Sequence, residues 1–161
     1  TPKTFSYDGK IIRSKGAKYM NWLVSEFKPF IDENYPTLRG RAHTAIVGSS
    51  MGGLMAMYAL SKYNGYFSRG AALSPSLWVY GGVPDFIERA GFRRRTIFYT
   101  DYGSKEFVNH ANMKTLFADT CSALIKKGVM ITSRVVPDGT HSEASWEKSL
   151  PYLFESVFPE L

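Results

Sequence analysis

The residue pattern with the clearest chemical meaning is Gly48-Ser49-Ser50-Met51-Gly52-Gly53. It fits G-x-S-x-G, the pattern of a nucleophile elbow, in which a serine lies on a sharp turn between a strand and a helix. An apolar run precedes it at 44–47, and helical apolar periodicity follows it. Ser50 is therefore a candidate nucleophile, and the Met51 N–H at the start of that helix is a candidate oxyanion donor. The alternatives are a plain Gly- and Ser-rich connecting loop and, less favoured, a phosphate loop, because G-x-x-x-x-G-K-[ST] is absent.

A serine hydroxyl needs a base, and the chain has three histidines. Ligands of open α/β sheets bind at the carboxyl ends of the strands. His141, in the loop after the last predicted strand, lies at that edge together with Ser50. His110 is at the same edge but in the first turn of a predicted helix, and His43 precedes the strand that leads to Ser50. Position therefore favours His141 as the base over His110, and His43 is interpreted as a surface residue.

A carboxylate must orient the imidazole, and two candidates follow the predicted strand 96–100. Asp101 comes directly after it, whereas Glu106 comes after the turn 102–105. Either gives the chain order serine, acid, histidine, which is the order of α/β-hydrolases. Each also has a structural interpretation, Glu106 as a carboxylate at a helix start and Asp101 as a turn residue bonding its own backbone. The residues alone leave this choice open.

The elements that must position these side chains are predicted by apolar periodicity, which switches between helix and strand spacing along the chain. Strands are expected at 44–47, 71–73, 96–100 and 129–136. Helices are expected at 17–34 with a bend or restart at Pro29, after the elbow as far as 64–65, from Pro84 to near 91, from about 104 to 128, and at 143–158. This alternation predicts an α/β fold with a mostly parallel sheet flanked by helices. Cys121 falls on the apolar stripe of the fourth helix, which indicates a buried structural thiol.

Composition restricts the class of protein further. The 161 residues are 44% hydrophobic and 21% charged, which predicts a single globular domain over 1–161. The net charge is +6, but only 93–95 form a basic run, so a solvated rim is favoured over nucleic-acid binding. No apolar run is long enough to cross a membrane, and no metal-ligand cluster or cofactor motif occurs, so no metal and no cofactor is expected. A single cysteine excludes an internal disulfide and is compatible with a reducing cytosol, but localisation stays open because no signal peptide is visible and the chain begins on Thr1.

Taken together, the motifs resemble the esterase-D-like (Putative esterase) family of α/β-hydrolases, which includes enterochelin, feruloyl and acetyl-xylan esterases and mycolyltransferases. The resemblance extends over nearly the whole chain. The segments that carry it are the helix text 26–32, the elbow 48–53, Ser-Pro-Ser-Leu-Trp at 74–78, Tyr-Gly-Ser-Lys-Glu at 102–106, and Gly-Thr-His at 139–141 with Trp146 five residues on.

The resemblance implies a role for single positions. Ser50 matches the family nucleophile, His141 the general base and Met51 the residue whose backbone N–H helps to bind the oxyanion. Glu106 matches the acid of the family's G-x-x-[DE] turn, which selects it over Asp101. The segment 74–78 lies beside the site in such proteins, so Trp78 and Tyr80 are expected to line the acyl or alcohol pocket, unless they only pack a long loop.

The implied activity is that of a serine carboxylic-ester hydrolase, acting on a small-molecule ester through an acyl-enzyme. Two alternatives stay open. One is an acyltransferase of the mycolyltransferase type, which uses the same site with another acceptor. The other is a catalytically silent α/β-hydrolase fragment used for binding.

One departure from the family concerns the strands that its members carry ahead of the helix at 17–34, where one loop supplies a second oxyanion N–H. Residues 1–15 are expected to be too few to form those strands. The strand at 44–47 would then have an exposed edge. The chain is therefore expected to be the C-terminal part of a larger catalytic domain, or to have this edge covered by a preceding segment or by a second copy in a homo-oligomer.

Overall fold

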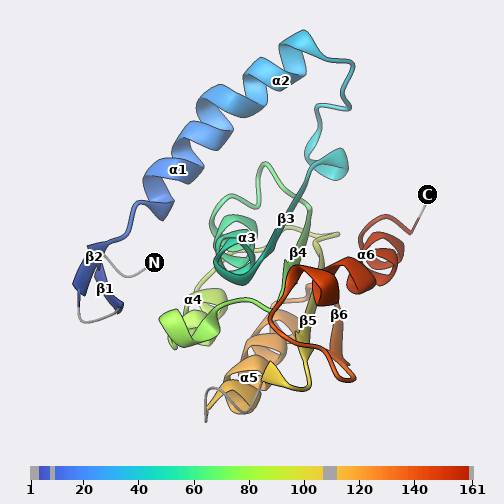
Figure 1. Cartoon of the computed structure of the whole chain (residues 1–161). Coiled ribbons are helices and arrows are strands. Elements are labelled where there is room, and N and C mark those ends of the chain that lie inside the picture. The colour runs from blue at the N-terminus through green and yellow to red at the C-terminus, as the bar shows by residue number, and fades with distance from the viewer. Residues whose placement is uncertain (1–3, 8–9, 107–111, 160–161) are drawn as a thin grey trace.

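The protein is described from a computed structural model, which places residues 4–7, 10–106 and 112–159. Its centre is a sheet of four parallel strands in the order β3-β4-β5-β6 (Figure 1). The strands are β3 (Ala45–Ser49), β4 (Arg69–Leu73), β5 (Ile97–Gly103) and β6 (Met130–Val136). Ser49 lies opposite Leu73, and Leu73 lies opposite Asp101. The carboxyl ends of the strands therefore meet at one edge, and the predicted parallel α/β sheet is confirmed.

Helices cover both faces of this sheet. Successive side chains of a strand point to opposite faces, so apolar residues of β5 contribute to a packed cluster on each face. Phe98 and Tyr102 pack with the cluster that includes residues of α3 (Ser50–Lys62), α4 (Val83–Glu88) and α5 (Met113–Lys126). Tyr99 packs on the other face with residues of α6 (Glu143–Val157). Strand β4 carries Gly-Ala-Ala in its middle, which lets helices approach it closely. Cys121 is buried in the first cluster, as predicted.

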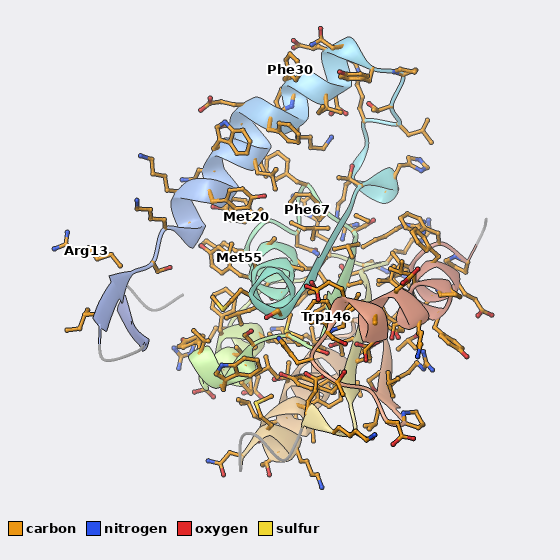
Figure 2. All side chains as sticks on the ribbon, in the orientation of Figure 1. Arg13, Met20, Phe30, Met55, Phe67 and Trp146 are labelled. Atoms are coloured by element: carbon orange, nitrogen blue, oxygen red, sulfur yellow. The ribbon has the colours of Figure 1, made fainter. Side chains whose placement is uncertain are left out.

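The predicted first helix forms as a continuous run of three segments. They are α1 (Gly16–Trp22), a π-helical turn η1 (Leu23–Phe27) and α2 (Lys28–Asn34). Pro29 accounts for the interruption, because its ring would clash with the carbonyl four residues earlier and its nitrogen carries no hydrogen. Met20 is buried in the core beside α3, which anchors the first part of this helix (Figure 2).

Two short strands that the sequence did not indicate precede this helix. Strands β1 (Thr4–Tyr7) and β2 (Lys10–Arg13) form an antiparallel pair, with Thr4 opposite Arg13. This pair is a separate two-stranded sheet and does not join the main one (Figure 1). A local hairpin needs only short-range pairing, so even these few residues can form it.

The sheet edge at β3 is open among the residues that the structure describes, since β4 is its only strand neighbour there. Beside it lies a groove of about 940 Å³, lined mostly by apolar side chains of the long helix, β3 and α3. Phe27, Leu38 and Val47 contribute exposed apolar surface to it. Within the described ranges, none of the helices is long and apolar enough to cross a membrane.

Candidate active site

The elbow motif forms the turn between β3 and α3. Ser50 is the first residue of α3 and has a φ of 53°, a left-handed conformation that is rare for a residue with a side chain. A Cβ at Gly48 would collide with the backbone carbonyl of Gly52, so the tight turn requires glycine there. The Met51 N–H belongs to the first turn of α3, where backbone amides have no carbonyl partner within the helix. Together these features place a serine hydroxyl beside a free, positively polarised helix start.

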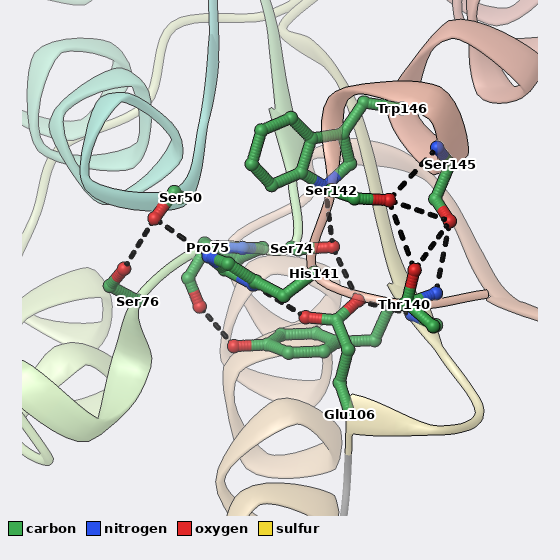
Figure 3. A network of polar contacts seen from close by, with 12 residues as sticks. Ser50, Ser74, Pro75, Ser76, Glu106, Thr140, His141, Ser142, Ser145 and Trp146 are labelled. Carbon is green, nitrogen blue, oxygen red and sulfur yellow. Dashed lines mark hydrogen bonds and ion pairs between the residues drawn. The ribbon is translucent and has the colours of Figure 1, made fainter. Parts of the chain in front are cut away.

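Three of the predicted side chains meet at this point. Ser50 Oγ lies 2.8 Å from His141 Nε2, and His141 Nδ1 lies 2.7 Å from Glu106 Oε2 (Figure 3). His141 reaches the site from the loop between β6 and α6, and Glu106 from the turn after β5. Glu106 is buried, whereas His141 is more exposed. The arrangement is a continuous hydrogen-bonded chain of hydroxyl, imidazole and carboxylate.

Two glycines hold the acid turn against the histidine loop. Gly103 and Gly139 are in backbone contact, and a Cβ on Gly103 would collide with the Gly139 carbonyl. The Lys105 N–H donates to the Gly139 carbonyl over 3.0 Å, and the Gly103 N–H donates to Glu106 Oε1 over 2.8 Å. The distance between acid and histidine is therefore fixed by main-chain contacts rather than by side chains alone.

A second hydrogen-bonded chain holds Glu106 from the other side. The Ser74 hydroxyl donates to Glu106 Oε1 over 2.6 Å, and Trp146 Nε1–H donates to Ser74 Oγ over 2.9 Å (Figure 3). Ser74 also has a positive φ, 44°, and its N–H donates to the Asp101 carbonyl at the end of the neighbouring strand. Oε1 thus has two donors, which leaves Oε2 as the oxygen that faces His141.

Aromatic rings surround the imidazole. Trp78 and Trp146 lie edge-on to His141, with ring centroids 5.5 and 5.1 Å from it. Trp78 is 38% exposed, so it lies at the mouth of the site. Tyr80 lies farther along the same segment and lines a cavity of about 60 Å³ together with Met51 and residues of α3 and α4. The predicted placement of Trp78 and Tyr80 near the nucleophile agrees with this geometry, and their role with a substrate stays a prediction.

The other candidates from the sequence lie elsewhere. His43 is exposed in a 3-10 turn ahead of β3, at the amino end of that strand. His110 lies outside the described residues. Asp101 is still within β5 and is 1% exposed, with the Tyr99 hydroxyl donating to its Oδ2 over 2.8 Å on the face that α6 covers. Burial raises the pKa of Asp101, against the opposing effect of hydrogen bonds from Ser149 and Tyr99.

Two further observations concern groups that could bind a metal ion or act as a nucleophile. The described residues contain no cluster of three or more His, Cys, Asp or Glu that could hold a metal ion. Burial raises the pKa of the Cys121 thiol to about 11, so this thiol is a weak nucleophile at neutral pH. Ser50 is the nucleophile candidate with a base in hydrogen-bonding contact.

A comparison with family models matches residues 7–155 to the family described as Putative esterase. The chain belongs to this family. A curated relative of this member is the uncharacterized protein YbbA of Bacillus subtilis (strain 168), which is 33% identical over 92 residues, or 56% of this chain and 36% of the relative.

Solved structures of esterases share the fold of this Putative esterase family member. A ferulic acid esterase has a TM-score of 0.68 at 22% identity, over 86% of this chain and 60% of that one. The enterobactin esterase FES from Shigella flexneri has a TM-score of 0.70 at 18% identity, over 89% and 38%. The siderophore hydrolase EstB from Aspergillus nidulans has a TM-score of 0.67 at 16% identity, over 94% and 60%. The matches confirm the α/β-hydrolase type of fold, and the chain spans between about a third and three fifths of the length of these relatives.

Two polar residues of the site, Ser74 and Ser76, belong to no chemical motif in the sequence besides the segment that resembles the Putative esterase family. A usable signal was present, because both follow β4, the strand next to the elbow strand, at the sheet edge where ligands bind. The left-handed backbone of Ser74, which aims its hydroxyl at Glu106, has no comparable sequence signal.

Proposed function

We propose that this member of the Putative esterase family is a serine carboxylic-ester hydrolase, with Ser50 as nucleophile, His141 as general base and Glu106 as orienting acid. The observation that carries the proposal is the unbroken contact from Ser50 Oγ to His141 Nε2 to Glu106, at 2.8 and 2.7 Å. These are the distances that proton transfer between a nucleophile and its base requires. Family membership and the esterase folds support ester hydrolysis as the reaction class.

In the first half of the reaction, Ser50 Oγ attacks the ester carbonyl carbon while His141 Nε2 takes the hydroxyl proton. Negative charge moves to the carbonyl oxygen, where the Met51 N–H at the start of α3 donates a hydrogen bond to it. The carbon–oxygen bond to the alcohol then breaks, and His141 returns the proton to the leaving alcohol. The product is an acyl group on Ser50.

In the second half, a water molecule takes the place of the alcohol. His141 accepts a proton from this water, which attacks the acyl carbon, and the bond to Ser50 Oγ breaks with return of the proton to Oγ. Glu106 keeps the proton of the neutral imidazole on Nδ1, so that Nε2 can accept, and it stabilises the imidazolium formed in each half.

The substrate proposed is a small-molecule ester whose acyl or alcohol part contacts Trp78 and Tyr80. Trp78 borders His141, and Tyr80 shares an apolar cavity with Met51, so an apolar or aromatic group of the ester would find complementary surface near the nucleophile.

The test is reaction of the chain with a fluorophosphonate and with a nitrophenyl ester. We expect a phosphonate adduct on Ser50, located by peptide mass spectrometry, and a burst of nitrophenol. Both should be lost in Ser50→Ala and His141→Ala. Ser61→Ala is the matched control, because Ser61 is a buried serine of α3 whose hydroxyl donates to the Met57 carbonyl. Full labelling or turnover in either site variant would remove that residue from the mechanism.

The same measurements distinguish the two alternatives, an acyltransferase and a catalytically silent fragment used for binding. Acyl transfer would give an acylated sugar or alcohol when that acceptor competes with water, with the same requirement for Ser50. A silent binding fragment would leave Ser50 unlabelled in a folded chain.

A further inference from the structure

Ser76 is a buried serine in direct contact with the proposed nucleophile. Its Oγ lies 3.2 Å from Ser50 Oγ, and the residue is 1% exposed (Figure 3). It belongs to the segment Ser74-Pro75-Ser76 at the carboxyl end of β4. Neither the family match nor the likeness to solved structures gives this residue a role.

The segment that carries Ser76 is held firmly against the elbow. The Ser76 N–H donates to the Ser50 carbonyl over 3.0 Å. Pro75 packs against Gly53, where a Cβ would come within 3.1 Å of the proline Cα, and its carbonyl accepts from the Tyr102 hydroxyl. The two hydroxyls are therefore neighbours because backbone contacts on both sides place them so.

The direction of each hydrogen bond along Glu106, His141 and Ser50 follows from the Glu106 carboxylate, which can only accept. An ionised Glu106 has no proton to give, so His141 Nδ1–H donates to it and His141 Nε2 must accept. The Ser50 hydroxyl proton then points to Nε2. Ser50 Oγ has only lone pairs left for its other neighbour, so the Ser76 hydroxyl is the donor in the contact between the two serines.

We propose that Ser76 is a fourth catalytic residue, whose hydroxyl donates a hydrogen bond to Ser50 Oγ throughout the reaction. This inference rests on the proposed serine mechanism. The contact occupies an Oγ lone pair, so the Ser50 proton is directed to His141 rather than to the neighbouring hydroxyl.

The same contact strengthens when charge develops. During attack, Ser50 loses its proton to His141 and its oxygen becomes more negative before the bond to the acyl carbon is complete. During breakdown of the acyl-enzyme, the bond between the acyl carbon and Oγ breaks, Oγ keeps the electron pair and takes the proton from His141. A donor already aimed at Oγ stabilises both stages, because hydrogen bonds to charged acceptors are stronger than those to neutral ones.

The experiment measures the second-order rate of Ser50 phosphonylation and the kcat for a nitrophenyl ester in Ser76→Ala, with Ser61→Ala as control. We expect both quantities to fall about 10- to 100-fold in Ser76→Ala, the effect of losing one hydrogen bond to a developing charge. KM should stay within about threefold of its original value, because the donor faces Oγ rather than bound ester. Ser61→Ala should react at the original rate.

A second variant keeps the test decisive if Ser76→Ala does not fold. Ser76→Cys retains a side chain of similar shape but offers only a weak S–H donor. We expect a rate below the original and above that of the alanine variant. An unchanged phosphonylation rate in a folded Ser76→Ala or Ser76→Cys overturns the proposal, while Ser50 remains a live nucleophile. Absence of any Ser50 labelling in the unaltered chain overturns the serine mechanism and this proposal with it.

Discussion

Replacement of Glu106 by glutamine tests whether Glu106 is the acid that holds the imidazole proton of His141 on Nδ1. The new amide has one accepting end and one donating end. The Gly103 N–H points at the Oε1 position over 2.8 Å, so the amide oxygen must lie there, since an NH2 group would oppose another donor. The NH2 group is thereby placed at the Oε2 position, 2.7 Å from His141 Nδ1.

This orientation forces the wrong tautomer on the imidazole. The amide donates to His141 Nδ1, so the ring proton moves to Nε2, where it faces Ser50 Oγ and blocks proton transfer. In a serine hydrolase triad, such a change of tautomer costs about 10⁴-fold in kcat. That factor corresponds to about 5.4 kcal/mol of activation free energy. We expect Glu106→Gln to lower ester turnover by this order while the variant stays folded.

The matched variant is Asp101→Asn, which changes the other carboxylate near the end of β5. Asp101 accepts from Tyr99 on the face under α6, and an asparagine oxygen can accept the same bond. We expect its turnover to stay within about threefold of the original, because it does not set the imidazole tautomer. The assay is the nitrophenyl ester burst with thermal unfolding as a check. Turnover of Glu106→Gln within tenfold of the original, or an equal loss in Asp101→Asn, would refute the assignment of the acid.

Three further predictions concern other parts of the molecule. Burial raises the pKa of Asp101 in the folded chain. Ionisation of Asp101 therefore lowers the unfolding free energy once the pH rises above the ordinary pKa of an aspartate, and this cost is absent in acid. The unfolding free energy of Asp101→Asn relative to the original should therefore increase from pH 3 to 7, and a flat difference in denaturant titrations would contradict this. The Cys121 thiol has its pKa raised to about 11 by burial. At pH 8 it should therefore react with iodoacetamide at least about 100-fold more slowly in the folded chain than in denaturant, with the modified fraction measured by mass spectrometry. Equal rates would show that the thiol is accessible in the folded chain. The open edge of β3 beside the apolar groove should cause the chain to self-associate, which light scattering would detect. Val47→Lys, at a position 48% exposed, should reduce this self-association. A chain that stays monomeric at high concentration would contradict the prediction.

Much of the fold followed from local patterns. The alternation of strands and helices was confirmed because a buried strand and an amphipathic helix each have a period visible in a short window. The expected strand at 96–100 was too short, since the structure extends β5 to Gly103. The hairpin of β1 and β2 was missed because four-residue strands give little periodic signal.

By itself, the sequence determined where the elbow lies and that Ser50 heads a helix at the carboxyl edge of a parallel sheet. Those properties depend on neighbours along the chain, chiefly the glycine at 48, where a Cβ would collide with the backbone of Gly52. Residue spacing left the carboxylate partner of His141 open and the family resemblance selected Glu106, but only the tertiary structure shows why Glu106 and not Asp101 reaches the imidazole. Because β5 continues past Asp101, the pleat of the sheet turns that side chain under α6, whereas Glu106 lies beyond the strand and is turned back by Gly103 and Ser74. The contacts of Ser74 and Ser76 were likewise decided by packing between β4 and its neighbours, which no spacing in the sequence records.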